Sequence, residues 1–85
     1  MTYLVDIKRS AQKELSKLPE TIVRKIITQI GELANNPRPN GCKKLTGSEN
    51  TYRIRVTDYR IIYSIFDNHL VIQVIKIGHR KDIYQ

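Results

Sequence analysis

The 85-residue sequence contains one cysteine, two histidines and no long apolar run. A single cysteine, Cys42, cannot form a disulfide within the chain, and its separation from His69 and His79 does not match the spacing of a metal site. No apolar stretch approaches the roughly 20 residues of a membrane-spanning helix, and we expect no signal peptide. We therefore expect a cytosolic (cytoplasmic) protein with no metal, no cofactor and no membrane association.

Acidic residues are also scarce, since 8 Asp and Glu stand against 15 Lys and Arg, which gives a net charge of +7. The excess of positive charge concentrates in residues 38–66, which contain six basic and only two acidic residues. The six are Arg38, Lys43, Lys44, Arg53, Arg55 and Arg60. This imbalance indicates a phosphate-rich or acidic partner. The alternative is a basic protein whose charge serves only solubility.

The length predicts a single domain, residues 1–85, with a small core, because chains this short bury only roughly 60–65% of their unfolded surface. Hydrophobic residues make up 40% of the chain, so the sequence predicts a folded rather than a disordered protein. We find no internal repeat, low-complexity segment or domain linker.

The N-terminal half predicts one strand followed by two helices. Residues 3–8 alternate between apolar and polar side chains, as in a half-buried strand. Ser10 is the expected N-cap of a first helix, which Pro19 ends. An apolar stripe predicts a second helix from Glu20 to Ala34. The two helices follow each other almost without a linker, so they form a helical hairpin whose stripes need a sheet to cover them.

The C-terminal half predicts a loop and three strands. Residues 38–50 contain two Pro/Gly turns and predict a surface loop, from which Lys43 and Lys44 either contact a phosphate backbone or face solvent. The apolar residues 70–77 predict a central strand, covered on both faces along part of its length, which Gly78 ends. With the hairpin described next, the element order is β-α-α-β-β-β, an α+β fold.

The segment Tyr52–Tyr63, YRIRVTDYRIIY, predicts two strands joined by a two-residue turn at Thr57 and Asp58, and the second strand continues to Phe66. Side chains alternate between the faces of a strand, so one face is apolar and the other carries arginines. The predicted cross-strand pairs are Arg55–Arg60, Ile54–Ile61 and Arg53–Ile62. Opposed like charges cost up to about 1 kcal/mol, so this pattern indicates polyanion binding rather than fold stability.

These arginines suit phosphate chemistry but not proton transfer. Arginine stays protonated and its fork pairs with two phosphate oxygens at once. Arg53, Arg55 and Arg60 can therefore bind RNA and stabilise the charge that develops on phosphorus during strand cleavage. They cannot readily accept a proton from a 2′-hydroxyl. Tyr84 and His79 are the titratable candidates for that step.

The C-terminal tail adds three candidates, and each has a plainer alternative. We expect His79 and Arg80 to emerge from the last strand beside the arginine face. His79 is alternatively a plain loop residue, and Tyr84 a frayed terminal aromatic. The hairpin arginines are alternatively a solvated outer face, with Arg60 paired to Asp58.

The chain resembles the RelE-type toxins of the RelE/ParE superfamily, from bacterial or archaeal toxin–antitoxin pairs. The resemblance covers nearly the whole length and rests on the helical hairpin, on Leu45-Thr46-Gly47, on YRIRVTDYRIIY and on the terminal VIKIGHRKDIY. It implies a small domain with an antiparallel or mixed sheet, the helical hairpin on one face and RNA on the other, concave face. It also implies ribosome-dependent, metal-independent mRNA cleavage by 2′-hydroxyl attack, which leaves a 2′,3′-cyclic phosphate and a 5′-hydroxyl.

The resemblance also implies site residues and partners. Carried over by position, the catalytic set is Arg53, Arg55, Arg60, Arg80 and Tyr84. The family has lysines where this chain has Arg53 and Arg55, so proton transfer falls on Tyr84, His79 or ribosomal RNA groups. The implied partners are the 70S ribosome, mRNA and a RelB-like antitoxin that covers the arginines or displaces the tail. The alternatives are a ParE-like toxin that poisons DNA gyrase and a nucleic-acid-binding module without catalysis.

Overall fold

The computed structural model describes residues 2–79 and 81. In chain order, the elements are β1 (Leu4–Ile7), α1 (Arg9–Ser16), α2 (Glu20–Leu33), β2 (Lys43–Lys44), β3 (Thr51–Val56), β4 (Tyr59–Phe66) and β5 (Val71–His79). The strands form one sheet in the order β1-β5-β4-β3-β2. β1 runs parallel to β5, and the other neighbouring strands are antiparallel, so the sheet is mixed. The predicted α+β fold is confirmed.

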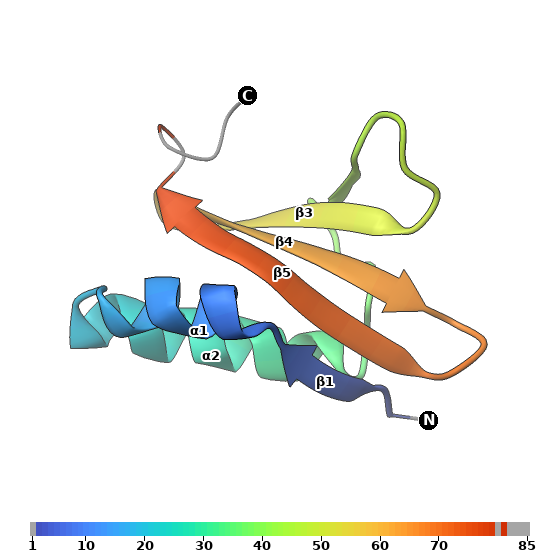
Figure 1. The fold of residues 1–85 in the computed structure, drawn as a ribbon, viewed down its shortest axis with the longest axis horizontal. Helices are drawn as coiled ribbons and strands as arrows, with labels where there is room; N and C mark the ends of the chain where they lie inside the picture. The colour runs from blue at the N-terminus through green and yellow to red at the C-terminus, as the bar shows by residue number, and fades with distance from the viewer. Residues whose placement is uncertain (1, 80, 82–85) are drawn as a thin grey trace.

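Both helices lie on one face of this sheet (Figure 1). Neither α1 nor α2 covers the opposite face, which is called the open face below. Pro19 takes the N-cap position of α2 with φ −58°, a value that the proline ring imposes and that suits the start of a helix. The expected cap at Ser10 is wrong, because α1 begins at Arg9, so the N-cap position falls on Lys8, two residues earlier, and no side chain caps the helix.

The core lies between the helices and the apolar face of the sheet. On α2, Ile26, Ile30 and Leu33 recur at helical spacing and are 0–4% exposed. They pack in one buried cluster with the helix-facing side chains of β3, β4 and β5. Tyr63 of β4 is completely buried, and its hydroxyl donates a 2.7 Å hydrogen bond to the carbonyl of Pro37. Burial raises the pKa of the Tyr63 phenol above its ordinary value.

A polar cluster joins four segments that are distant in sequence. The Arg38 guanidinium, in the loop after α2, pairs with the Asp67 carboxylate in the β4–β5 turn at 2.9 Å. The Tyr3 hydroxyl donates to the same carboxylate at 2.6 Å. Arg38 also lies over the Tyr52 ring, 5.2 Å from its centroid, and donates to the Tyr52 hydroxyl. The hydrogen bonds from Arg38 and Tyr3 lower the pKa of the Asp67 carboxyl.

Two sequence predictions need correction in the C-terminal half. The predicted loop of residues 38–50 contains the short edge strand β2, which pairs with β3. Gly78 does not end β5, because the strand continues to His79. β5 lies inside the sheet, between β1 and β4, and Lys76 is its one exposed residue. Among the described helices, none combines the length and the apolar character that a membrane crossing requires.

Candidate nucleic-acid interface

The β3–β4 hairpin has the register that its sequence predicts. Arg55 lies opposite Arg60, Ile54 opposite Ile61 and Arg53 opposite Ile62, with Thr57 and Asp58 as the turn. Ile54 and Ile61 are buried against the helices. Because side chains alternate along each strand, Arg53, Arg55 and Arg60 share the open face. The hairpin therefore places three guanidinium groups from two neighbouring strands on one surface.

Arg60 is the most enclosed of the three arginines, with 9% of its surface exposed. It lies opposite Arg55 on one side and opposite Gly78 of β5 on the other. Gly78 therefore places no side chain of its own beside Arg60. A permanently charged and largely enclosed guanidinium is well suited to hold a phosphate in one position.

Arg55 is more exposed and is oriented by the hairpin turn. Its Nε donates a 2.7 Å hydrogen bond to the Thr57 carbonyl, and its Nη2 lies 3.7 Å from the Asp58 carboxylate. From the sequence, Asp58 is an alternative partner of Arg60. In the structure, Asp58 pairs with Arg55. Thr57 has φ +55°, a left-handed conformation that is strained for a β-branched residue. The turn therefore orients the Arg55 side chain at the cost of backbone strain at Thr57.

A second row of side chains crosses the open face next to the Arg55–Arg60 pair. The pairing register aligns Lys43 on β2, Arg53 on β3, Ile62 on β4 and Lys76 on β5. Lys44 pairs with Tyr52 and so belongs to the other face. Of the two lysines predicted to contact RNA, only Lys43 shares the face of the arginines. Lys76 was missed by the sequence reasoning.

The expected position of His79 is wrong. His79 lies opposite Tyr59 at the end of β5, and the two rings are 5.4 Å apart in an edge-to-face contact. Tyr59 packs against the core, so His79 is on the helix-covered face and not beside the arginines. Arg80 and Tyr84, predicted from the tail, lie outside the described residues.

The rest of the open face is apolar or uncharged except for Asp6 of β1, which accepts a 3.4 Å hydrogen bond from Gln73 of β5. Next to the basic rows, the Thr51 and Ser64 hydroxyls contact each other at 3.1 Å. Beyond them, Leu4 of β1 and Phe66 of β4 both flank Val71 of β5 and are 69% and 37% exposed. The positive charge is therefore confined to one end of the open face. Among residues 2–79 and 81, no cluster of His, Cys, Asp or Glu is arranged to hold a metal ion.

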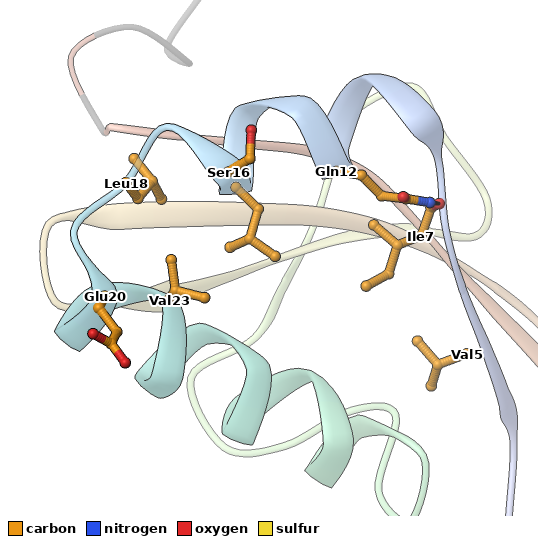
Figure 2. A pocket seen from close by; sticks show the side chains of 8 residues that line it. Val5, Ile7, Gln12, Ser16, Leu18, Glu20 and Val23 are labelled. Carbon is orange, nitrogen blue, oxygen red and sulfur yellow. Dashed lines mark hydrogen bonds between the residues drawn. The ribbon is translucent and has the colours of Figure 1, made fainter.

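A separate apolar groove lies on the helix side of the molecule, between α1, α2 and β1 (Figure 2). Its apolar lining is Val5, Ile7, Leu15, Leu18 and Val23. The Gln12 side chain donates to the Ile7 carbonyl at 2.7 Å on its rim. The helical hairpin therefore does not fully close over β1.

The chain is similar in sequence and in structure to known toxins of toxin–antitoxin pairs. A family model described as "ParE toxin of type II toxin-antitoxin system, parDE" matches residues 5–84. "Toxin RelG" of Mycobacterium tuberculosis is 30% identical over 86 residues, covering 100% of this chain and 99% of the relative. "mRNA interferase toxin RelE" of Escherichia coli is 31% identical over 83 residues, covering 95% of this chain and 86% of the relative. The solved RelE–RelB complex of Pyrococcus horikoshii is similar in structure, with TM-score 0.85 and 34% identity, covering 94% of this chain and 97% of the other.

Proposed function

Because this chain belongs to the RelE-type toxins of the RelE/ParE family, from type II toxin–antitoxin systems, we propose that it is a ribosome-dependent mRNA endoribonuclease. One observation carries the proposal: the register of β3 and β4 puts Arg53, Arg55 and Arg60 on the open face, which neither α1 nor α2 covers. The name of the Escherichia coli relative, an mRNA interferase, supports the same activity. Since ribosomes and mRNA are its targets, the protein acts in the cytoplasm.

Each arginine has a distinct part in the proposed reaction. The 2′-hydroxyl of one nucleotide attacks the adjacent phosphorus, and the phosphorane that forms carries extra negative charge. Arg60 is nearly buried, so it is pre-oriented to stabilise that charge without reorganising. Arg53 and Arg55, on the neighbouring strand, hold the flanking phosphates in place. The bond to the 5′-oxygen then breaks, which leaves a 2′,3′-cyclic phosphate and a 5′-hydroxyl.

The proposal gives the C-terminal tail a supporting part and needs no metal from the protein. Arg80 adds a further cation to the phosphorane, and Tyr84 is a candidate for proton transfer, as the family resemblance implies. Lys43 extends the basic row toward the sheet edge and contacts RNA beyond the cleaved bond. Arginine charge supplies the electrostatic stabilisation that a metal ion provides in other nucleases.

We further propose that a RelB-like antitoxin inhibits this toxin. The similar Pyrococcus horikoshii structure is a complex of RelE with RelB. The basic end of the open face would attract an acidic segment that folds upon it, because opposite charges favour encounter and orientation. By covering Arg53, Arg55 and Arg60, such a segment would exclude mRNA.

The proposal is tested with purified protein and ribosomes that carry one defined mRNA. Cleavage is read by mapping new 5′-hydroxyl ends within the decoding site. We expect cleavage by the wild type and a loss of about a hundredfold or more in Arg60→Gln, since removing one preorganised donor costs about 10²–10³ in rate. Arg9→Gln, which removes an exposed arginine on the helix side, is the matched control and should cleave normally.

The description of the matching family model favours a second candidate, a ParE-like toxin that inhibits DNA gyrase without cutting RNA. A supercoiling assay with purified gyrase separates the two. Gyrase inhibition together with intact mRNA on programmed ribosomes would establish this second function and exclude the first.

A further inference from the structure

Lys76 projects onto the open face next to Arg60. Lys76 lies opposite Ile62 on β4, two residues before Gly78, which lies opposite Arg60. Residues in this diagonal relation have Cα atoms roughly 7–8 Å apart, within reach of long side chains. The Lys76 ammonium and the Arg60 guanidinium can therefore contact the same phosphodiester from two sides.

A β-bulge places Lys76 on this face. Along β4, Ile62 and Tyr63 are consecutive, but their partners on β5 are Lys76 and Val74, so Ile75 is an extra residue. Without the bulge, strict alternation from the buried Val74 would put Lys76 toward the helices. Bulges are enriched beside active sites, where they redirect a side chain. The bulge thus exposes an ammonium group that would otherwise point into the core.

The proposed cleavage leaves one chemical need that the arginines do not meet. The departing 5′-oxygen is a strongly basic alkoxide, and donation of a proton to such a leaving group typically accelerates reactions by about 10²–10⁴. Arginine does not release its proton in proteins. Among residues 2–79 and 81, His79 faces the helices, and Lys43 lies two strands away from Arg60 at the sheet edge. Lys44 belongs to the helix-covered face, and Lys81 lies beyond the end of β5.

We infer that Lys76 is a catalytic residue that protonates the 5′-oxygen during cleavage, an inference that rests on the proposed endoribonuclease function. The O2′–P bond forms as the P–O5′ bond breaks. The proton of the attacking 2′-hydroxyl passes to a base, either Tyr84 or water, and a proton of the Lys76 ammonium passes to the 5′-oxygen. The resulting neutral amine then regains a proton from water, so the enzyme returns to its starting state.

The experiment uses single-turnover cleavage on programmed ribosomes with two mRNAs. One mRNA carries the natural linkage, and the other carries sulfur in place of the bridging 5′-oxygen at the cleavage site. A thiolate leaves without a proton, so only the natural linkage depends on a general acid. Lys76→Met removes the proton donor at similar length, and Lys76→Arg keeps the charge but not the exchangeable proton. Lys13→Met, on α1, is the matched control.

We expect Lys76→Met and Lys76→Arg to cleave the natural linkage about a hundredfold more slowly than the wild type, yet to cleave the sulfur linkage within about threefold of it. Equal losses on both linkages would overturn the inference, because they indicate a role in binding alone. Full activity of Lys76→Arg on the natural linkage would also overturn it. If the wild type cleaves neither mRNA, the proposed function itself fails. Lys76 is exposed, so the variants should keep the circular dichroism spectrum and melting temperature of the wild type.

Discussion

The opposed arginines at the centre of the hairpin predict a measurable repulsion within the folded protein. Arg55 and Arg60 form a direct cross-strand pair, and such pairs of like charge are destabilising by a few tenths to about 1 kcal/mol. Arg60 is 9% exposed, so water screens the pair less than it screens a fully exposed one. We therefore expect about 0.5–1 kcal/mol of unfavourable coupling between the two residues.

A double-mutant cycle measures this coupling. The four proteins are the wild type, Arg55→Met, Arg60→Met and the double variant, and urea unfolding followed by circular dichroism gives each free energy of unfolding. Removing Arg60 should be more favourable, by the coupling energy, when Arg55 is present than when it is absent. The ion pair between Arg55 and Asp58 cancels in the cycle, because it is absent from both proteins that lack Arg55.

Salt provides an internal control. The Debye length falls from about 10 Å at 0.1 M to about 3 Å at 1 M, so the coupling should drop by half or more. A coupling near zero at low salt, or a favourable one, would refute the reasoning, because it would mean that the two guanidinium groups do not share one patch. The same single variants should lose mRNA cleavage.

Three further predictions concern the scaffold. Tyr63→Phe should lower the free energy of unfolding by about 1–1.5 kcal/mol in urea titrations, because the Pro37 carbonyl loses its buried hydrogen bond; equal stability would contradict this. Asp67→Asn should lower the melting temperature at pH 7. Arg38 lowers the pKa of the folded carboxyl, so this difference should shrink as the pH falls below about 4, and a pH-independent difference would contradict the assignment. Thr57→Gly should stabilise the protein by about 0.5–1 kcal/mol in urea titrations, because glycine relieves the strain at φ +55°; a loss would show that the strain is negligible.

Much of the fold follows from local sequence patterns. The alternation in Tyr52–Tyr63 was sufficient to predict the hairpin register, since a shift by one residue would move every isoleucine out of the core. Pro19 and the stripe of α2 likewise marked the helical hairpin. These features depend on neighbours along the chain, which a sequence displays directly.

The features that were missed depend on contacts between distant segments. β2 consists of two lysines with no apolar alternation, and it is a strand only because β3 pairs with it. The bulge at Ile75 is set by the pairing of β5 with β4, so the position of Lys76 was not predictable from alternation. His79 was misplaced for a similar reason, because Gly78 was expected to end β5 and instead continues it.

The account depends most directly on the claim that the open face contacts mRNA through its arginines. The decisive measurement is the single-turnover rate of mRNA cleavage on programmed ribosomes by Arg53→Gln, Arg55→Gln and Arg60→Gln, each checked for folding. The account predicts slower cleavage by all three variants. Arg60→Gln should have the lowest rate, because Arg60 is the most enclosed of the three arginines. Rates within threefold of the wild type in all three folded variants would contradict it.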